Sequence, residues 1–244
     1  MLHAMATAWD RAAEGYAAQW LPRYVPYQQD LIRELTLRTG DRVLVTAAGP
    51  GAEAVAVARL VGNTGSVRAT DTSHTMVRLA RERVRAAGFT ELVHVDEADA
   101  LDTSGGPWDA IVCAFGLWQV GDREKTLATW RNALSPLGKV GVLVWGPPDV
   151  EGPWIAFRRA LARADAALAD GMRWTEAERE PMARLFEQAG LELVRHTVVR
   201  HTLTFHSAES FVRALEEACI FPDLERRLGD DGYHRVVVSF YDQV

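Results

Sequence analysis

The sequence predicts an α/β fold with a doubly wound, mainly parallel sheet of the seven-stranded type. Three observations predict it. Short apolar runs alternate with helix-forming stretches between residues 42 and 145. Runs such as 140–145 are apolar throughout, which is typical of parallel strands covered on both faces. A glycine-containing turn, residues 47–51, separates the first apolar run from the first of these helices.

Strands and helices are expected to alternate along this region. We expect strands at 42–46, 66–70, 92–95, 110–115 and 139–145, and helices at 51–61, 73–87 and 123–134. Thr72 or Ser73 is placed to cap the second of these helices, and Gly88 to end it. This alternation is the pattern of βαβ units.

The segments on either side are predicted to be mostly helical. Trp9, Ala13, Tyr16 and Trp20 share one helical face, and Pro26 is expected to open a second helix. After residue 148 we expect helices over 154–169, 175–188 and 207–219, and a long strand over 191–205. Periodicity does not decide whether residues 236–240 form a strand or a helix.

Composition narrows the class of protein. The 244 residues are enough for one core, so we expect a single domain, monomeric or homodimeric. A net charge of −6 argues against a nucleic-acid partner. The chain has no apolar run long enough to span a membrane and no secretory signal at its start, so we expect a cytoplasmic protein. Cys113 and Cys219 form no metal-binding pattern, and no metal is expected.

The glycine turn and Asp71 together predict a nucleoside-binding site. Asp71 ends the second expected strand, twenty residues after Gly51. In a Rossmann-like fold, such glycines let a ligand approach the backbone, and such a carboxylate accepts hydrogen bonds from a ribose diol. Aspartate as a helix cap is the plainer interpretation, although Thr72 and Ser73 are available for that role.

The chain resembles the class I S-adenosylmethionine-dependent methyltransferases, and most of all the ubiquinone/menaquinone-biosynthesis type and related small-molecule enzymes. The resemblance covers nearly the whole chain and is strongest from Arg42 to Gly146. It is carried by Val43–Gly51, Asp71-Thr72-Ser73-His74-Thr75-Met76, Glu97-Ala98-Asp99-Ala100, Phe115–Val120 and the turn Leu134–Lys139.

This resemblance implies a cofactor, S-adenosyl-L-methionine, with S-adenosyl-L-homocysteine as the product. It places the cofactor's methionine part over the first motif, its ribose at Asp71, its adenine beside Met76 and Asp99, and the methyl group near the loop after the fourth strand. The cofactor-binding residues expected are Ala47, Gly49, Gly51, Asp71, Thr72, Met76, Asp99, Ala100, Phe115, Trp118 and Tyr16. Tyr16 or Trp118 is a candidate lid for the sulfonium cation. For Tyr16 a purely structural place in the core is the plainer interpretation.

The chain departs from the family at Val45, where an acid usually helps to hold the cofactor's ammonium group. Two alternative functions therefore stay open at this stage. One is a protein that binds the cofactor but catalyses another reaction, such as cyclisation. The other is an NAD(P)-dependent oxidoreductase, because Gly49-x-Gly51-x-x-Ala54 with a later Asp also fits a dinucleotide fingerprint.

We expect methyl transfer to oxygen, with carbon or nitrogen less favoured, of a small and fairly apolar metabolite in secondary-metabolite biosynthesis. Residues 1–40 are expected to form a helical lobe, 41–147 the cofactor-binding core, and 151–174 with 207–228 a cap over the acceptor. His201 is the candidate catalytic base, although a histidine on an apolar face is more often structural.

Overall fold

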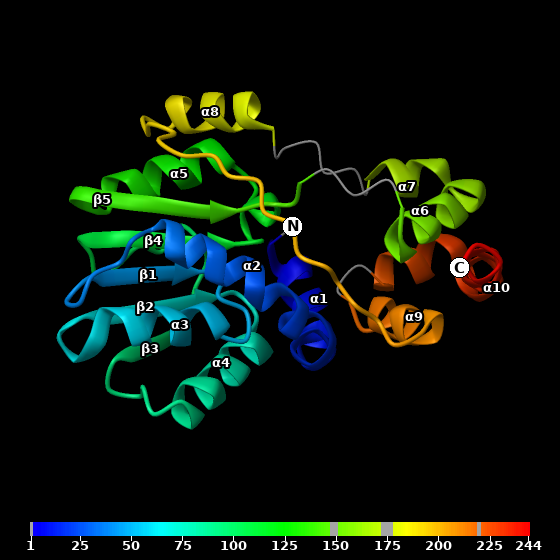
Figure 1. The fold of residues 1–244 in the computed structure, drawn as a ribbon, viewed down its shortest axis with the longest axis horizontal. Helices are drawn as coiled ribbons and strands as arrows, with labels where there is room; N and C mark the ends of the chain where they lie inside the picture. The colour runs from blue at the N-terminus through cyan, green and yellow to red at the C-terminus, as the bar shows by residue number, and fades with distance from the viewer. Residues whose placement is uncertain (1, 147–150, 172–177, 219–220) are drawn as a thin grey trace.

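The computed structural model describes residues 2–146, 151–171, 178–218 and 221–244. Its centre is a parallel sheet with the strand order β3-β2-β1-β4-β5, flanked by helices on both faces (Figure 1). The strands are β1 (Arg42–Thr46), β2 (Ser66–Asp71), β3 (Val93–Glu97), β4 (Trp108–Ala114) and β5 (Leu134–Leu143). The doubly wound parallel sheet is confirmed. The expectation of seven strands is wrong for the described residues, which form five.

The strand order reverses between β1 and β4. The chain steps outward from β1 to β2 and β3 through α3 (Ala52–Val61) and α4 (His74–Ala86), and then returns to β4 beside β1. In open α/β sheets, ligands bind at the carboxyl ends of the strands at such a switch point. The topology therefore selects the edge where β1, β2 and β4 end.

Alternating side chains of each strand pack into two different layers. Val43 and Val45 of β1 are buried with residues of α3 and α4, whereas Leu44 is buried on the opposite face. That face is covered by α5 (Arg123–Asn132) and α8 (Arg179–Gln188), which contribute Trp130 and Phe186. Because both faces are covered, the central strands β1 and β4 are buried along most of their length.

The N-terminal lobe is one nearly continuous helix. α1 (Leu2–Gly15) passes through a π-helical turn, Tyr16–Trp20, into α2 (Leu21–Glu34). Pro26 lies inside α2 and a proline stands in its first turn at position 22, so the expectation that Pro26 opens the helix is wrong. α1 lies beside α4, where Asp10 accepts hydrogen bonds from the Ser73 hydroxyl (2.6 Å) and the Thr75 N–H (3.0 Å).

A second group of helices lies beyond the carboxyl ends of the strands (Figure 1). It comprises α6 (Pro153–Ala164), α7 (Ala166–Gly171), α9 (Ala208–Glu216) and α10 (Phe221–Tyr241). Phe157, Phe211 and Phe240 are buried between them. The helix expected over 154–169 is interrupted at Asp165, whose carboxylate accepts from the Leu168 N–H at 3.0 Å. The undecided tail is helical, as part of α10.

The strand expected over residues 191–205 does not form. The segment runs from α8 to α9 without strand pairing. The Tyr27 hydroxyl donates to the His201 carbonyl (2.7 Å) and accepts from the His201 N–H (3.1 Å), while Arg23 donates to the Thr204 carbonyl (3.0 Å). Side chains of α2 therefore satisfy backbone groups that a neighbouring strand would otherwise pair with. Across the described ranges, none of the helices combines the length and apolarity needed to cross a membrane.

Candidate functional site

The carboxyl ends of the strands open into a cavity of about 1500 Å³ at the switch point between β1 and β4. Its walls come from the N-terminal lobe, the glycine turn, the ends of β2 and β4, β5, and the segment after α8. The predicted site residues that line it are Tyr16, Ala47, Gly49, Asp71, Thr72, Met76, Asp99, Ala100, Phe115, Trp118 and His201. Residues up to 185 positions apart in sequence (Tyr16 and His201) are thus brought to one site.

The glycine turn has a backbone conformation that side chains disfavour. Ala47, Gly49 and Gly51 have positive φ angles of 50°, 51° and 79°. A Cβ atom added at Gly49 would have no heavy atom within 4 Å, so this rim of the cavity is open to a ligand. A Cβ at Gly51 would lie 2.9 Å from the Ala80 Cβ. Gly51 does not line the cavity, and its role in the structure is the close packing of α3 on α4.

Asp71 is held at the end of β2 by two backbone groups. The Gly49 N–H donates to its Oδ2 (2.8 Å) and the Ser73 N–H to its Oδ1 (2.9 Å). Each oxygen keeps a lone pair for a further donor, which suits a ribose diol. Burial raises the pKa of Asp71, although these two hydrogen bonds lower it, and the nearby Asp10 carboxylate raises it further. A cationic ligand would relieve this concentration of negative charge.

The neighbouring residues complete this side of the cavity. Met76 is buried in the first turn of α4 and lines the cavity with Thr72. Asp99 and Ala100 follow β3 and face the same space. The Asp99 Oδ1 accepts from the Leu101 N–H at 2.7 Å, so this oxygen also shapes the local turn.

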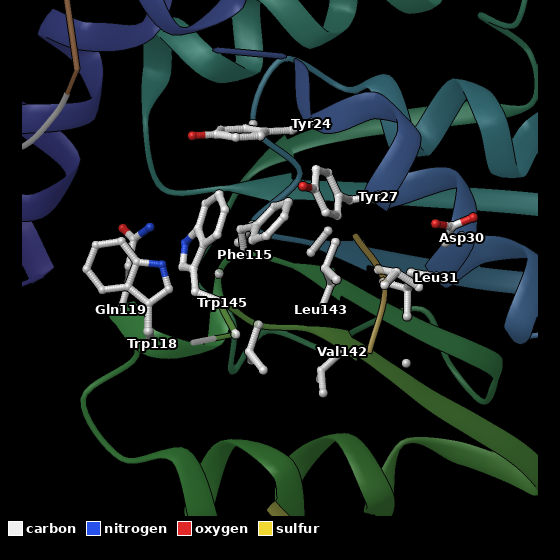
Figure 2. Close-up of a pocket in the computed structure, with 18 of the residues that line it drawn as sticks. Tyr24, Tyr27, Asp30, Leu31, Phe115, Trp118, Gln119, Val142, Leu143 and Trp145 are labelled. Carbon is white, nitrogen blue, oxygen red and sulfur yellow. The ribbon is translucent and has the colours of Figure 1, made fainter. Parts of the chain in front are cut away.

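Aromatic rings form the wall opposite Asp71. The rings of Phe115 and Trp145 stack at 4.1 Å, and Tyr24 contacts both, at 5.3 Å and 5.0 Å between ring centroids. Figure 2 shows these rings together with Tyr27 in the cavity. We call Tyr24, Tyr27, Phe115 and Trp145 the aromatic wall. Sequence analysis identified Phe115 and missed the other three, although Trp20, Tyr24 and Tyr27 recur at helical spacing.

The loop after β4 contacts the glycine turn directly. A Cβ at Gly116 would lie 2.5 Å from the Ala47 Cβ, so the two loops have no room between them. Phe115, before Gly116, has a positive φ of 58°. Trp118 follows in a short 3-10 turn, Leu117–Gln119, and its indole Nε1 is buried without a hydrogen-bond partner in the described ranges. Trp9 of α1 donates to the Gln119 side chain, which ties the N-terminal lobe to this loop.

The polar end of the aromatic wall contains His201. Its Nε2 lies 2.6 Å from the Asp30 Oδ2, and its ring packs edge-on against Tyr27 at 4.6 Å between centroids. The hydrogen bond from His201 lowers the pKa of Asp30. Sequence analysis missed Asp30 because it is one of several acids on an exposed-looking helix. Among the described residues, no group of three or more His, Cys, Asp or Glu side chains is arranged to hold a metal ion.

Comparison with known proteins adds independent information. The model of the ubiE/COQ5 methyltransferase family matches residues 24–162. A ubiquinone/menaquinone biosynthesis C-methyltransferase of Ralstonia nicotianae is 33% identical over 178 residues, which is 68% of this chain and 73% of that protein. A protein of the same name from Cupriavidus taiwanensis is 34% identical over the same shares of the two chains.

Two solved structures share the fold. A SAM-dependent methyltransferase from Aquifex aeolicus has a TM-score of 0.50 and 22% identity over 59% of this chain and 82% of its own. A Bacillus halodurans protein has a TM-score of 0.51 and 18% identity over 67% and 68%. At these identities the likeness concerns the fold alone.

Proposed function

Because the chain belongs to the ubiE/COQ5 methyltransferase family and is thereby an S-adenosylmethionine-dependent methyltransferase, we propose that it methylates a small, apolar, hydroxylated aromatic compound. The observation that carries this proposal is a cavity whose aromatic wall leads to a polar group formed by Asp30, Tyr27 and His201. The family match supports neither the oxidoreductase nor the non-methylating alternative, since the matched relatives are methyltransferases.

The described residues fit the cofactor. In the proposed arrangement, Asp71 accepts from the ribose hydroxyls with the lone pairs that Gly49 and Ser73 leave free. Gly49 offers a backbone surface without a side chain, and Met76 with Asp99 receives the adenine ring. The faces of Phe115 and Trp118 stabilise the sulfonium cation. When bound, the cofactor supplies an electrophilic methyl group.

The proposed base is His201, positioned by Asp30 and Tyr27. Because the Asp30 carboxylate accepts from Nε2, the proton resides on Nε2 and the basic lone pair on Nδ1. The Tyr27 hydroxyl is engaged by the backbone of His201 on both sides, so it fixes the histidine. In this proposal, Nδ1 takes the proton of the acceptor hydroxyl. The loss of this proton makes the aromatic ring of the acceptor electron-rich.

The acceptor atom follows from the same chemistry. A deprotonated phenol is nucleophilic at its oxygen and at the ring carbons beside and opposite it. The sequence alone favoured oxygen, and the printed names of the two relatives, both C-methyltransferases of ubiquinone/menaquinone biosynthesis, favour carbon. We propose a ring carbon as the first candidate and the oxygen as the second. After transfer to the carbon, with release of S-adenosyl-L-homocysteine, the hydrogen of that carbon would leave as a proton and the ring oxygen would take a proton back, which restores the aromatic phenol. A place in secondary metabolism stays a prediction.

The domain assignment also remains a proposal. We propose that residues 1–40 form the lobe over the cofactor, 41–147 the cofactor-binding core, and 151–174 with 207–228 the cap over the acceptor. Phe157 and Phe211 are buried within the cap helices, and the cavity reaches Trp154 and Phe211. Residues 1, 147, 172–174, 219 and 220 of these ranges lie outside the described part of the chain.

The test is turnover with the methyl-labelled cofactor and a panel of hydroxylated benzenes and naphthalenes, with aliphatic alcohols and amines as comparison. We expect label only in the aromatic compounds, and NMR of the product distinguishes a ring methyl group from a methoxy group. His201→Ala should lower kcat by about 10²–10⁴-fold, the usual contribution of a general base. Label only in amines or aliphatic alcohols, or full activity of His201→Ala, would contradict the proposal.

A further inference from the structure

A buried carboxyl group joins α2, which contributes two rings to the aromatic wall, to α3, which begins at the glycine turn. Glu53 stands in the first turn of α3, two residues after Gly51, and is only 3% exposed. Gln28 of α2 is 4% exposed, and its Nε2 donates to the Glu53 Oε1 at 2.7 Å. These two side chains connect the helix that bears Tyr24 and Tyr27 to the helix that begins at the glycine turn.

The other two oxygens of this pair lack partners. Within the described residues, neither the Glu53 Oε2 nor the Gln28 Oε1 has a hydrogen-bond partner, although both are buried. Two buried acceptors without donors are costly, and more so if the carboxyl group is ionised. If the carboxyl group is protonated, its O–H can donate to the amide oxygen, and a ring of two hydrogen bonds satisfies both groups.

We propose that Glu53 carries a proton at neutral pH and forms a two-bond acid–amide pair with Gln28, which positions α2 against the glycine turn. Glu53 is then a positioning residue for methyl transfer, since it couples the aromatic wall to the proposed cofactor site. The inference concerns the cofactor half of the site and the placing of α2, so it holds whichever acceptor is methylated.

The charges around Glu53 favour the neutral acid. Burial is the main cause that raises the pKa of Glu53, and the Asp71 carboxylate at the end of β2 adds to it. A hydrogen bond from the backbone N–H of Glu53 and the charge of Arg83 of α4 lower the pKa, and the net value is about 8. The Arg83 Nε donates to the Pro50 carbonyl at 2.8 Å, and no Lys, Arg or His of the described part forms an ion pair with Glu53. Cys113 of β4 adds no charge, because burial raises the pKa of its thiol to about 12 and the thiol stays neutral.

The direction of the pH effect follows from proton linkage. The folded-state pKa of Glu53, about 8, lies above its ordinary value of 4.5, so the folded protein binds more protons between these values. The contribution of Glu53 to stability is complete below about pH 4.5 and declines as the pH rises through about 8. The Glu53→Gln variant keeps an amide pair and loses this dependence.

The test compares the wild type with Glu53→Gln and Glu53→Leu. We expect the Tm of the wild type minus the Tm of Glu53→Gln to fall from pH 5 to 8 and then to level off, because only the wild type loses stability as Glu53 ionises. Infrared spectra at pH 7 should show a protonated-carboxyl band in the wild type that Glu53→Gln lacks. Amide exchange in α2 should accelerate by up to about tenfold in Glu53→Leu, as expected for the loss of one buried hydrogen bond, but not in Glu53→Gln.

Calorimetry with S-adenosylmethionine tests whether Glu53 positions the proposed cofactor site, because it measures the cofactor affinity of each variant. Glu53→Gln should bind the cofactor like the wild type, and Glu53→Leu more weakly. A difference in Tm that does not vary with pH, or the absence of a carboxyl band, would overturn the inference. If the cofactor binds and these signals appear while no aromatic compound is methylated, only the proposed acceptor is wrong.

Discussion

The proposed cofactor side and the proposed acceptor side of the cavity are constructed by different means. On the cofactor side, Asp71 is fixed by backbone N–H groups of Gly49 and Ser73, within a stretch of 25 residues. On the acceptor side, Asp30 and His201 meet across 171 positions of sequence. The first arrangement depends on turns at the ends of parallel strands, and the second on the packing of helices. The comparison teaches that local backbone geometry specifies one ligand, and tertiary packing the other.

Removal of one carboxylate from each side should separate the two functions. Asp71→Ala should weaken S-adenosylmethionine binding by about 10²–10⁴-fold, since two charge-assisted hydrogen bonds of about 1.5–3 kcal/mol each are lost. Asp30→Asn is the matched control and should leave this affinity unchanged, because Asp30 contacts His201. Isothermal calorimetry measures both. Equal weakening by the two variants would show that the cavity does not divide as described.

Two alanine substitutions in the glycine turn should differ in their main effect: one should mainly lower stability and the other mainly cofactor affinity. Gly51→Ala should lower the free energy of unfolding by about 2–5 kcal/mol, because its Cβ would meet Ala80 and its φ is left-handed. Gly49→Ala should cost only about 1–2 kcal/mol, because its Cβ meets open space, but it should weaken cofactor binding. Urea unfolding and calorimetry distinguish them. A stability loss at Gly49 as large as that at Gly51 would contradict this division.

The helix caps of the two sides provide the smallest contrast. The Ser73 hydroxyl accepts from the Met76 N–H at the start of α4 and donates to Asp10 of α1. Ser207 caps α9 in an exposed capping box with Ser210. We expect Ser207→Ala to cost about 1 kcal/mol, as an ordinary cap does, and Ser73→Ala about 2 kcal/mol, because a buried link is lost as well. Thermal unfolding of both variants checks the order.

The same division explains what the sequence predicted. The strand, turn and acid spacing around Gly49 and Asp71 is local, and it placed these residues in one cavity correctly. The segment 191–205 has apolar residues at intervals suited to a strand, but Tyr27 and Arg23 bind its backbone instead. Nothing in a linear pattern reveals such a competitor for hydrogen bonds.

Asp30 and Glu53 show a second limit of sequence reasoning. An acid in the first turn of a helix is ordinarily explained by the helix dipole, so Glu53 attracted no attention. Its burial against Gln28 depends on how α2 crosses α3, which is a property of the assembled fold. The sequence departure at Val45 left open whether the chain is a methyltransferase at all. The family match answers that question, which a buried valine in β1 cannot decide by itself.

The contact between Gly116 and Ala47 limits how this enzyme can change. The two loops at the switch point touch without room for another carbon atom at Gly116. A larger residue there would therefore displace the glycine turn and the loop after β4 together. Substitutions in α2 and in residues 191–205 are therefore expected to change the acceptor preference most readily, because they leave the proposed cofactor-binding residues unaltered. Directed evolution toward new acceptors should concentrate its libraries there.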